Sequence, residues 1–131
     1  DRSDDARIEI RPDRFDDRLD TLISVTSGPV VVAIMSHRDP PQLARLVGRV
    51  LEGERIVALV HHDPRSVPSG LEPSDRLIVL EDPGPCDWGR MNQAETVIRC
   101  LRETKRIPDF DWLLLISGQD YPAMHMCEIE R

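Results

Sequence analysis

The stretch "PVVVAIMS", residues 29–36, decides the fold that this sequence predicts. It is a continuous run of mostly β-branched apolar residues, and such a run is typical of a strand that is covered on both faces. Strands of this kind belong to parallel sheets, in which helices pack against both sides. The sequence therefore predicts an α/β protein whose first strand ends near Ser36.

Three further apolar runs predict the rest of the sheet. They are "RIVALVHHD" (55–63), "RLIVLED" (76–82) and "DFDWLLLIS" (109–117). Because the last run is long and continuously apolar, we expect it to be an inner strand. Helical patterns separate most of the strands, and this alternation favours a mainly parallel sheet.

Two helices are predicted between the strands, over 40–52 and 90–105. Asp39 is a good N-cap for the first, and prolines occupy its first turn, where a missing N–H costs nothing. A third helix is expected to start near Ala123. The apolar positions of the first helix are Leu43, Leu46, Val47, Val50 and Leu51. The second helix has an apolar stripe that we expect to be core, made of Met91, Ala94, Val97, Ile98 and Leu101.

The chain is expected to form one domain, because 131 residues suffice for one core but not for two. Residues 1–28 are rich in Asp and Arg, and their apolar spacing predicts a short lead-in helix; residues 29–131 form the α/β domain. The first residue is Asp rather than Met, and the last residues resemble the first turns of a helix. We therefore expect a fragment of a longer protein, truncated at its C-terminus.

The charge and the cysteines narrow the possible partners. Lys and Arg number 17 against 24 Asp and Glu, so the net charge is −7, and without a basic run nucleic acid is not an expected partner. The longest apolar run is far shorter than the ~20 residues that span a bilayer, so no membrane segment is predicted. Three cysteines without a CxxC spacing indicate a reducing compartment such as the cytoplasm.

Polar residues follow three of the predicted strands, at 36–38, 61–63 and 117–120. In an open parallel sheet the carboxyl ends of the strands form one edge, and ligands bind in the crevice outside it. These three loops therefore predict a small-molecule site. No GxGxxG or GxxxxGK[ST] motif is present, and Ser117 lacks the GxSxG elbow of a hydrolase nucleophile.

A metal site is an alternative, although no HExxH or comparable spacing supports it. Its possible ligands are His37, His61, His62, Asp63 and Asp120.

Each of these residues also has a structural interpretation. His61 can alternate into the core while His62 faces solvent, Asp63 can form a turn, and Asp120 can cap the helix that follows. Trp88 either anchors its loop by packing on the core or stacks on a ligand.

Four segments, in this order, resemble the core-2/I-branching β-1,6-N-acetylglucosaminyltransferase family and its xylosyltransferase relatives. They are "VVAIMSHRDPPQLARLV", "IVALVHHD", "DWGRMNQAETVIRCLR" and "FDWLLLISGQDYPAMHMCEI". The resemblance runs from about Pro29 to the end. It implies the nucleotide-binding half of a GT-A type glycosyltransferase, a Rossmann-like α/β/α sandwich. Such an enzyme transfers N-acetylglucosamine or xylose from a UDP-sugar to an acceptor hydroxyl of a glycan, with inversion.

The resemblance also implies roles for single residues. Met35, His37 and Asp63 would line the uridine pocket, and Asp120 would lie near the sugar and pyrophosphate. Because Asp120 is the only carboxylate where many GT-A enzymes have Asp-x-Asp, the resemblance implies metal-independent transfer without a cofactor. The full donor-binding set is Met35, His37, Asp63, Trp88, Gly118 and Asp120.

In this family the catalytic base and the residues that neutralise the phosphates come from a region C-terminal to the part matched here. The catalytic residues are thus expected outside this chain, and the chain alone is expected to be inactive. Two alternatives stay open: a nucleotide-binding module without transferase activity, and a different, metal-dependent Rossmann-like enzyme. The expected location is the bacterial cytoplasm, whereas vertebrate relatives work in the Golgi lumen.

Overall fold

The computed structural model describes residues 28–131, so the predicted lead-in helix lies outside the described residues. Four parallel strands form one sheet in the order β3-β2-β1-β4. They are β1 (Val30–Ser36), β2 (Ile56–His62), β3 (Leu77–Val79) and β4 (Trp112–Ser117). Both the α/β class and the parallel sheet are therefore confirmed.

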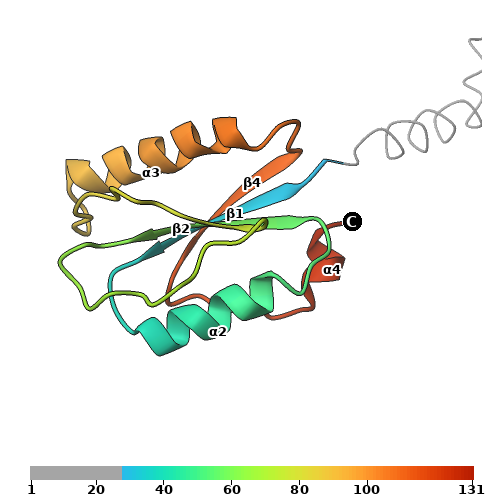
Figure 1. Ribbon diagram of the computed structural model, residues 1–131, viewed down its shortest axis with the longest axis horizontal. Coiled ribbons are helices and arrows are strands. Elements are labelled where there is room, and N and C mark those ends of the chain that lie inside the picture. The colour runs from blue at the N-terminus through green and yellow to red at the C-terminus, as the bar shows by residue number, and fades with distance from the viewer. Residues whose placement is uncertain (1–27) are drawn as a thin grey trace, which may run out of the picture.

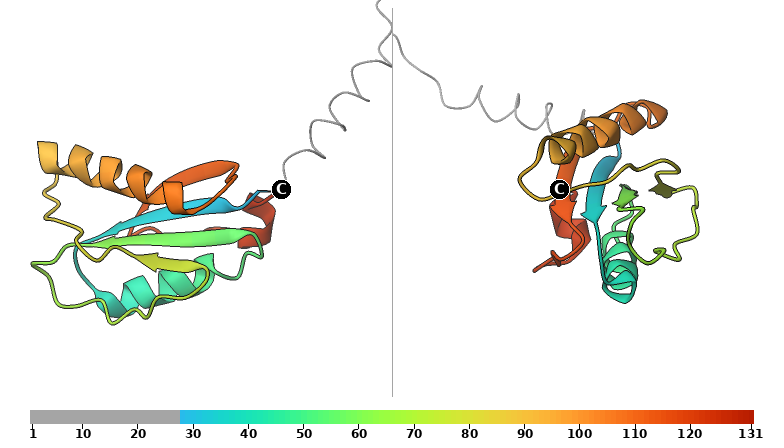
Figure 2. Two further views of the ribbon diagram at one scale, coloured as in Figure 1. Left: turned by 45° about the horizontal axis from the view of Figure 1, so that its top comes forward. Right: turned by 90° about the vertical axis from the view of Figure 1, so that its left-hand side faces the viewer.

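Helices cover both faces of the sheet (Figure 1). One face carries α2 (Pro40–Val50) and the short α4 (Met126–Ile129), and the other carries α3 (Met91–Glu103). A 3₁₀ turn, Thr104–Arg106, continues α3. The right-hand view of Figure 2 shows the sheet between these two helical layers. No helix among the described residues is long and apolar enough to cross a membrane.

The prediction for α2 is confirmed. The Asp39 carboxylate accepts a hydrogen bond from the N–H of Gln42 at 3.0 Å, and prolines occupy the first two helical positions. The helix ends at Val50, two residues before the predicted end. Its four buried side chains pack on β1 and β2, and they are Leu43, Leu46, Val47 and Val50.

The predicted core face of α3 is wrong. Met91, Ile98 and Leu101 are exposed, and the side that faces the sheet carries Thr96 and Cys100 instead. The buried Thr96 hydroxyl donates to the carbonyl of Asn92 at 2.9 Å, so its polar group is satisfied within the helix. A threonine whose hydroxyl is bonded within its own helix can be buried without an unpaired polar group, which residue polarity in the sequence does not reveal.

The expectation that the fourth strand is an inner strand is also wrong. β4 pairs only with β1, so it is an edge of the described sheet. Its side chains are all at least partly exposed, most of all Trp112. The two inner strands are β1 and β2, whose side chains are almost all buried.

The register of the sheet brings the strand ends to one level. Ser36 lies beside His62, and Met35 lies beside Ser117. The N–H of Asp63 donates to the carbonyl of Ser36 at 2.8 Å, which extends the ladder one residue past β2. The three predicted loops therefore leave the same carboxyl edge of the sheet.

Candidate functional site

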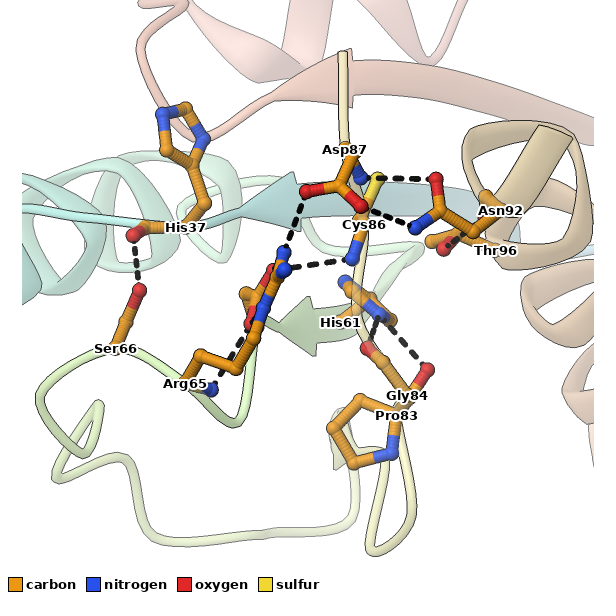
Figure 3. Close-up of polar contacts among 11 residues, drawn as sticks. His37, His61, Arg65, Ser66, Pro83, Gly84, Cys86, Asp87, Asn92 and Thr96 are labelled. Atoms are coloured by element: carbon orange, nitrogen blue, oxygen red, sulfur yellow. Dashed lines mark hydrogen bonds and ion pairs between the residues drawn. The ribbon is translucent and has the colours of Figure 1, made fainter. Parts of the chain in front are cut away.

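A cavity of about 480 Å³ lies at this edge (Figure 3). It is open to solvent, and three segments line it: the loop after β1, the loop after β2, and the segment 83–89 that leads into α3. Its walls contain three residues that the sequence singled out, together with four that it did not. The lining residues are His37, Asp63, Arg65, Ser66, Cys86, Asp87 and Trp88.

Asp63 is the centre of the hydrogen bonds in this wall. One carboxylate oxygen accepts from the backbone N–H of Arg65 at 2.9 Å and from its Nε at 3.0 Å. The other oxygen accepts from Nη2 of Arg65 at 2.7 Å and from the N–H of Cys86 at 3.0 Å. Asp63 is only 2% exposed, so both of its oxygens are used inside the protein.

The electrostatics of this pair follow from these contacts. Hydrogen bonds from the Arg65 guanidinium hold the pKa of Asp63 well below its usual range, although burial of the carboxylate opposes the shift. Asp63 therefore stays ionised at physiological pH. The contacts with Asp63 and Asp87 raise the pKa of Arg65 in turn, so its charge is permanent.

Asp87 ties the wall to the first turn of α3. It accepts from Nη2 of Arg65 at 2.9 Å and from the side-chain amide of Asn92 at 2.7 Å. The Asn92 oxygen accepts the backbone N–H of Asp87 at 3.0 Å in return. The bond from Asn92, and then that from Arg65, lowers the pKa of Asp87. These two aspartates fix the plane of the guanidinium, and its Nη1 has no hydrogen-bond partner among residues 28–131.

The two adjacent histidines at the end of β2 both have structural partners. Nε2 of His61 lies 2.9 Å from the carbonyls of Pro83 and Gly84, so this nitrogen carries the hydrogen and holds the 83–89 segment. Contrary to the sequence interpretation, His62 does not face solvent. It is buried, and both of its ring nitrogens have partners: Nδ1 lies 3.2 Å from the Ser36 hydroxyl, and Nε2 lies 2.7 Å from the Val67 carbonyl.

The side chains of His37 and Trp88 are exposed in the cavity. Trp88 is 90% exposed, so it does not anchor its loop by packing on the core. The exposed His37 side chain lies across the cavity from the Arg65 guanidinium, while its carbonyl accepts from the Ser66 hydroxyl (Figure 3). An indole, an imidazole and an oriented guanidinium thus line one opening.

Met35 lines a second, smaller cavity of about 80 Å³, which shares His37, Cys86 and Trp88 with the first. Gly118 packs directly behind this edge. A Cβ there would lie 2.8 Å from Cβ of Ser36, so the position requires glycine because of close approach, not because of an unusual backbone angle.

Asp120 is separate from the other predicted site residues. It accepts the N–H of Ser117 at 2.7 Å, which closes a turn, and it lines a different, apolar cavity beside α4. It does not cap a helix at Ala123. The helix starts at Met126, where the His125 side chain is the cap.

The five possible metal ligands do not gather in the structure. Among the described residues, no three His, Cys, Asp or Glu side chains lie close enough together to hold a metal ion. Sequence reasoning also missed Arg65, although a guanidinium two residues after a buried carboxylate in "HDPR" is a signal for such a pair. No protein-family model and no curated protein matches this chain.

Proposed function

We propose that this chain is the donor-binding part of an inverting glycosyltransferase of the GT-A, Rossmann-like type. The donor is a UDP-sugar, carrying N-acetylglucosamine or xylose, and the acceptor is a glycan hydroxyl. One observation carries the proposal: a single cavity contains His37, Asp63 and Trp88, which the motif resemblance assigns to the donor. Its volume lies in the range of small-molecule pockets.

In this proposal some residues of the cavity contact the nucleotide, and others hold those residues in position. The exposed Trp88 indole stacks on the uracil ring, since an aromatic face in water gains most by covering a base. Nη1 of Arg65 donates to oxygens of the nucleotide. Asp63 is buried and saturated, so it acts as a positioning residue for Arg65 and for the Cys86 segment.

Transfer itself needs groups that this cavity does not offer. The leaving UDP needs positive charge, but the charge of Arg65 is already matched by two carboxylates. The acceptor needs a free base, yet the two carboxylates of the cavity, Asp63 and Asp87, both accept hydrogen bonds within the chain on each of their oxygens. We therefore expect the chain to bind the donor without consuming it. A sensitive assay with radioactive UDP-sugar and simple glycans should detect no transfer.

Tryptophan fluorescence tests donor binding directly, because the chain has only two tryptophans. Trp112→Phe leaves Trp88 as the single reporter. Titration with UDP, UDP-N-acetylglucosamine and UDP-xylose in EDTA should give a saturable change in its emission. In the otherwise unchanged chain, Trp88→Ala should weaken UDP binding about tenfold, measured by calorimetry, as expected for the loss of one stacking contact.

Trp112→Ala is the matched control, because Trp112 is also exposed but lies on β4, outside the cavity. It should leave the UDP affinity unchanged. A folded chain that shows no saturable response to UDP at millimolar concentration contradicts the proposal. Equal losses from the two alanine variants would place the nucleotide elsewhere.

The second candidate is a nucleotide-binding module without transferase activity, and the engagement of both oxygens of Asp63 and of Asp87 favours it. The two candidates differ in sugar preference. A donor site should bind one UDP-sugar at least several-fold more tightly than UDP. A nucleotide-binding module without transferase activity should bind UDP and every UDP-sugar with similar affinity.

A further inference from the structure

A second group of reactive side chains lies at the amino edge of the sheet, opposite the cavity. It joins the first turn of α4 to the segment just after α2, and these two elements lie beside each other in Figure 1. The group consists of Glu52, His125 and Cys127. None of these residues takes part in the proposed donor site.

The distances place the His125 imidazole between the Cys127 thiol and the Glu52 carboxylate. Sγ of Cys127 lies 3.0 Å from Nδ1 of His125. The same Nδ1 accepts the backbone N–H of Cys127 at 3.3 Å, so it is the ring nitrogen without a hydrogen in the neutral imidazole. Nε2 then carries the hydrogen, and it lies 3.4 Å from a carboxylate oxygen of Glu52.

We propose that Cys127 is a reactive thiol and a site of oxidation by small hydroperoxides, with His125 as its base and Glu52 as the carboxylate that attracts the imidazolium once His125 holds the thiol proton. A nucleophile within hydrogen-bond distance of a base is the arrangement that activates thiols. This inference is independent of the proposed sugar-donor function.

The reaction balances with one molecule of hydrogen peroxide, the simplest hydroperoxide. His125 takes the thiol proton, and the sulfur attacks one peroxide oxygen, so that an S–O bond forms while the O–O bond breaks. The sulfur is oxidised by two electrons and the peroxide is reduced. The imidazolium returns its proton to the departing hydroxide, and the products are a sulfenic acid and water.

The surroundings allow a small oxidant to reach this thiol. Cys127 is partly exposed, and the side chains of His125 and Glu52 are 46% and 42% exposed. Arg49 pairs with the same Glu52 oxygen, and Glu128 is the nearest charged residue on α4 itself.

The other two cysteines provide internal references. Cys100 is buried, and this burial raises its pKa to about 11, so it should be unreactive at neutral pH. Cys86 is partly exposed like Cys127, but it has no hydrogen bond to an imidazole among the described residues. A difference in oxidation rate between Cys127 and Cys86 therefore reports the contribution of His125.

The test treats the full chain with hydrogen peroxide at pH 7 in the presence of a sulfenic-acid trap and follows the three cysteine peptides by mass spectrometry. An ordinary thiol is only a few per cent ionised at this pH, so we expect Cys127 to be trapped about tenfold faster than Cys86. Equal rates for the two thiols would overturn the proposal.

His125→Asn is the decisive variant, because Asn is a strong N-cap and keeps α4 while it removes the base. It should lower the Cys127 rate to that of Cys86, with an unchanged melting temperature. Glu52→Gln should cause a smaller loss. An undiminished Cys127 rate in folded His125→Asn would also overturn the proposal.

Discussion

Asp63 shows how one buried carboxylate can hold the wall of a cavity together through hydrogen bonds within the protein. Its oxygens hold Arg65 and the Cys86 segment at once, so two loops far apart in sequence depend on it. Sequence patterns marked Asp63 as a candidate site residue at the end of a strand, and the structure places it in the wall of the cavity. They could not show that its acceptors are filled from within, because those donors come from a turn and from a segment over twenty residues away.

We expect Asp63→Asn to lower the free energy of unfolding by about 2 kcal/mol at pH 7, because it removes charge-assisted hydrogen bonds. The pKa of Asp63 is lowered in the fold, so its stabilisation is complete above the unfolded pKa of about 3.9 and is lost as pH falls below that value. In urea unfolding, the unchanged chain and Asp63→Asn should therefore differ less in free energy of unfolding at pH 3 than at pH 7. A difference that grows toward acid would contradict this role.

Gly118 and Gly48 form a matched pair of positions that tests the close approach between Gly118 and Ser36. Gly118→Ala should destabilise by about 1–3 kcal/mol, because the new methyl meets Ser36. Gly48→Ala should stabilise by about 0.5–1 kcal/mol, because nothing lies near its Cβ position within α2. Thermal and urea unfolding should show a lower stability for Gly118→Ala and a higher stability for Gly48→Ala than for the unchanged chain.

At the scale of elements, α2 and α3 show when an apolar pattern can be trusted. The pattern of α2 has capping residues and one consistent face, and it predicts the buried side chains correctly. In α3 the apolar stripe is on the exposed side. The true core face carries Cys100 and Thr96, and the Thr96 hydroxyl bonds to the backbone carbonyl of Asn92, whereas a polarity scale counts threonine as hydrophilic.

This difference predicts unequal costs for the same change on the two helices. Leu46→Ala on α2 removes a fully buried side chain and should cost about 2–5 kcal/mol. Leu101→Ala on α3 should cost less than about 1 kcal/mol, because that side chain is 46% exposed. Similar losses in urea unfolding would mean that the α3 stripe is covered in solution.

For the whole molecule, the parallel sheet follows from the sequence but the strand order does not. A run such as "WLLLIS" is equally apolar in an inner strand and at an edge, because composition does not say what covers a surface. The convergence of three loops was predictable, since it depends only on parallel strands with aligned carboxyl ends. Asp120 falls outside the cavity because its side chain turns back to Ser117.

Hydrogen exchange should rank the strands by their place in the sheet. Amides of β1 are bonded on both sides of a buried strand and should exchange slowest, near the rate of global unfolding. The amides of β4 that point away from β1 should exchange far faster. If NMR finds these outer amides as protected as those of β1, another strand must pair with β4.

Arg55 connects places that lie far apart along the chain. Its guanidinium donates to the Gly28 carbonyl and to the Glu130 carbonyl, each at 3.0 Å, and it pairs with Asp111 at 2.8 Å. The peptide groups of residues 28 and 130 therefore lie within the span of one side chain. A few glycines could join them, and the domain could be reopened at the exposed Gly70, which makes this fold a natural candidate for circular permutation.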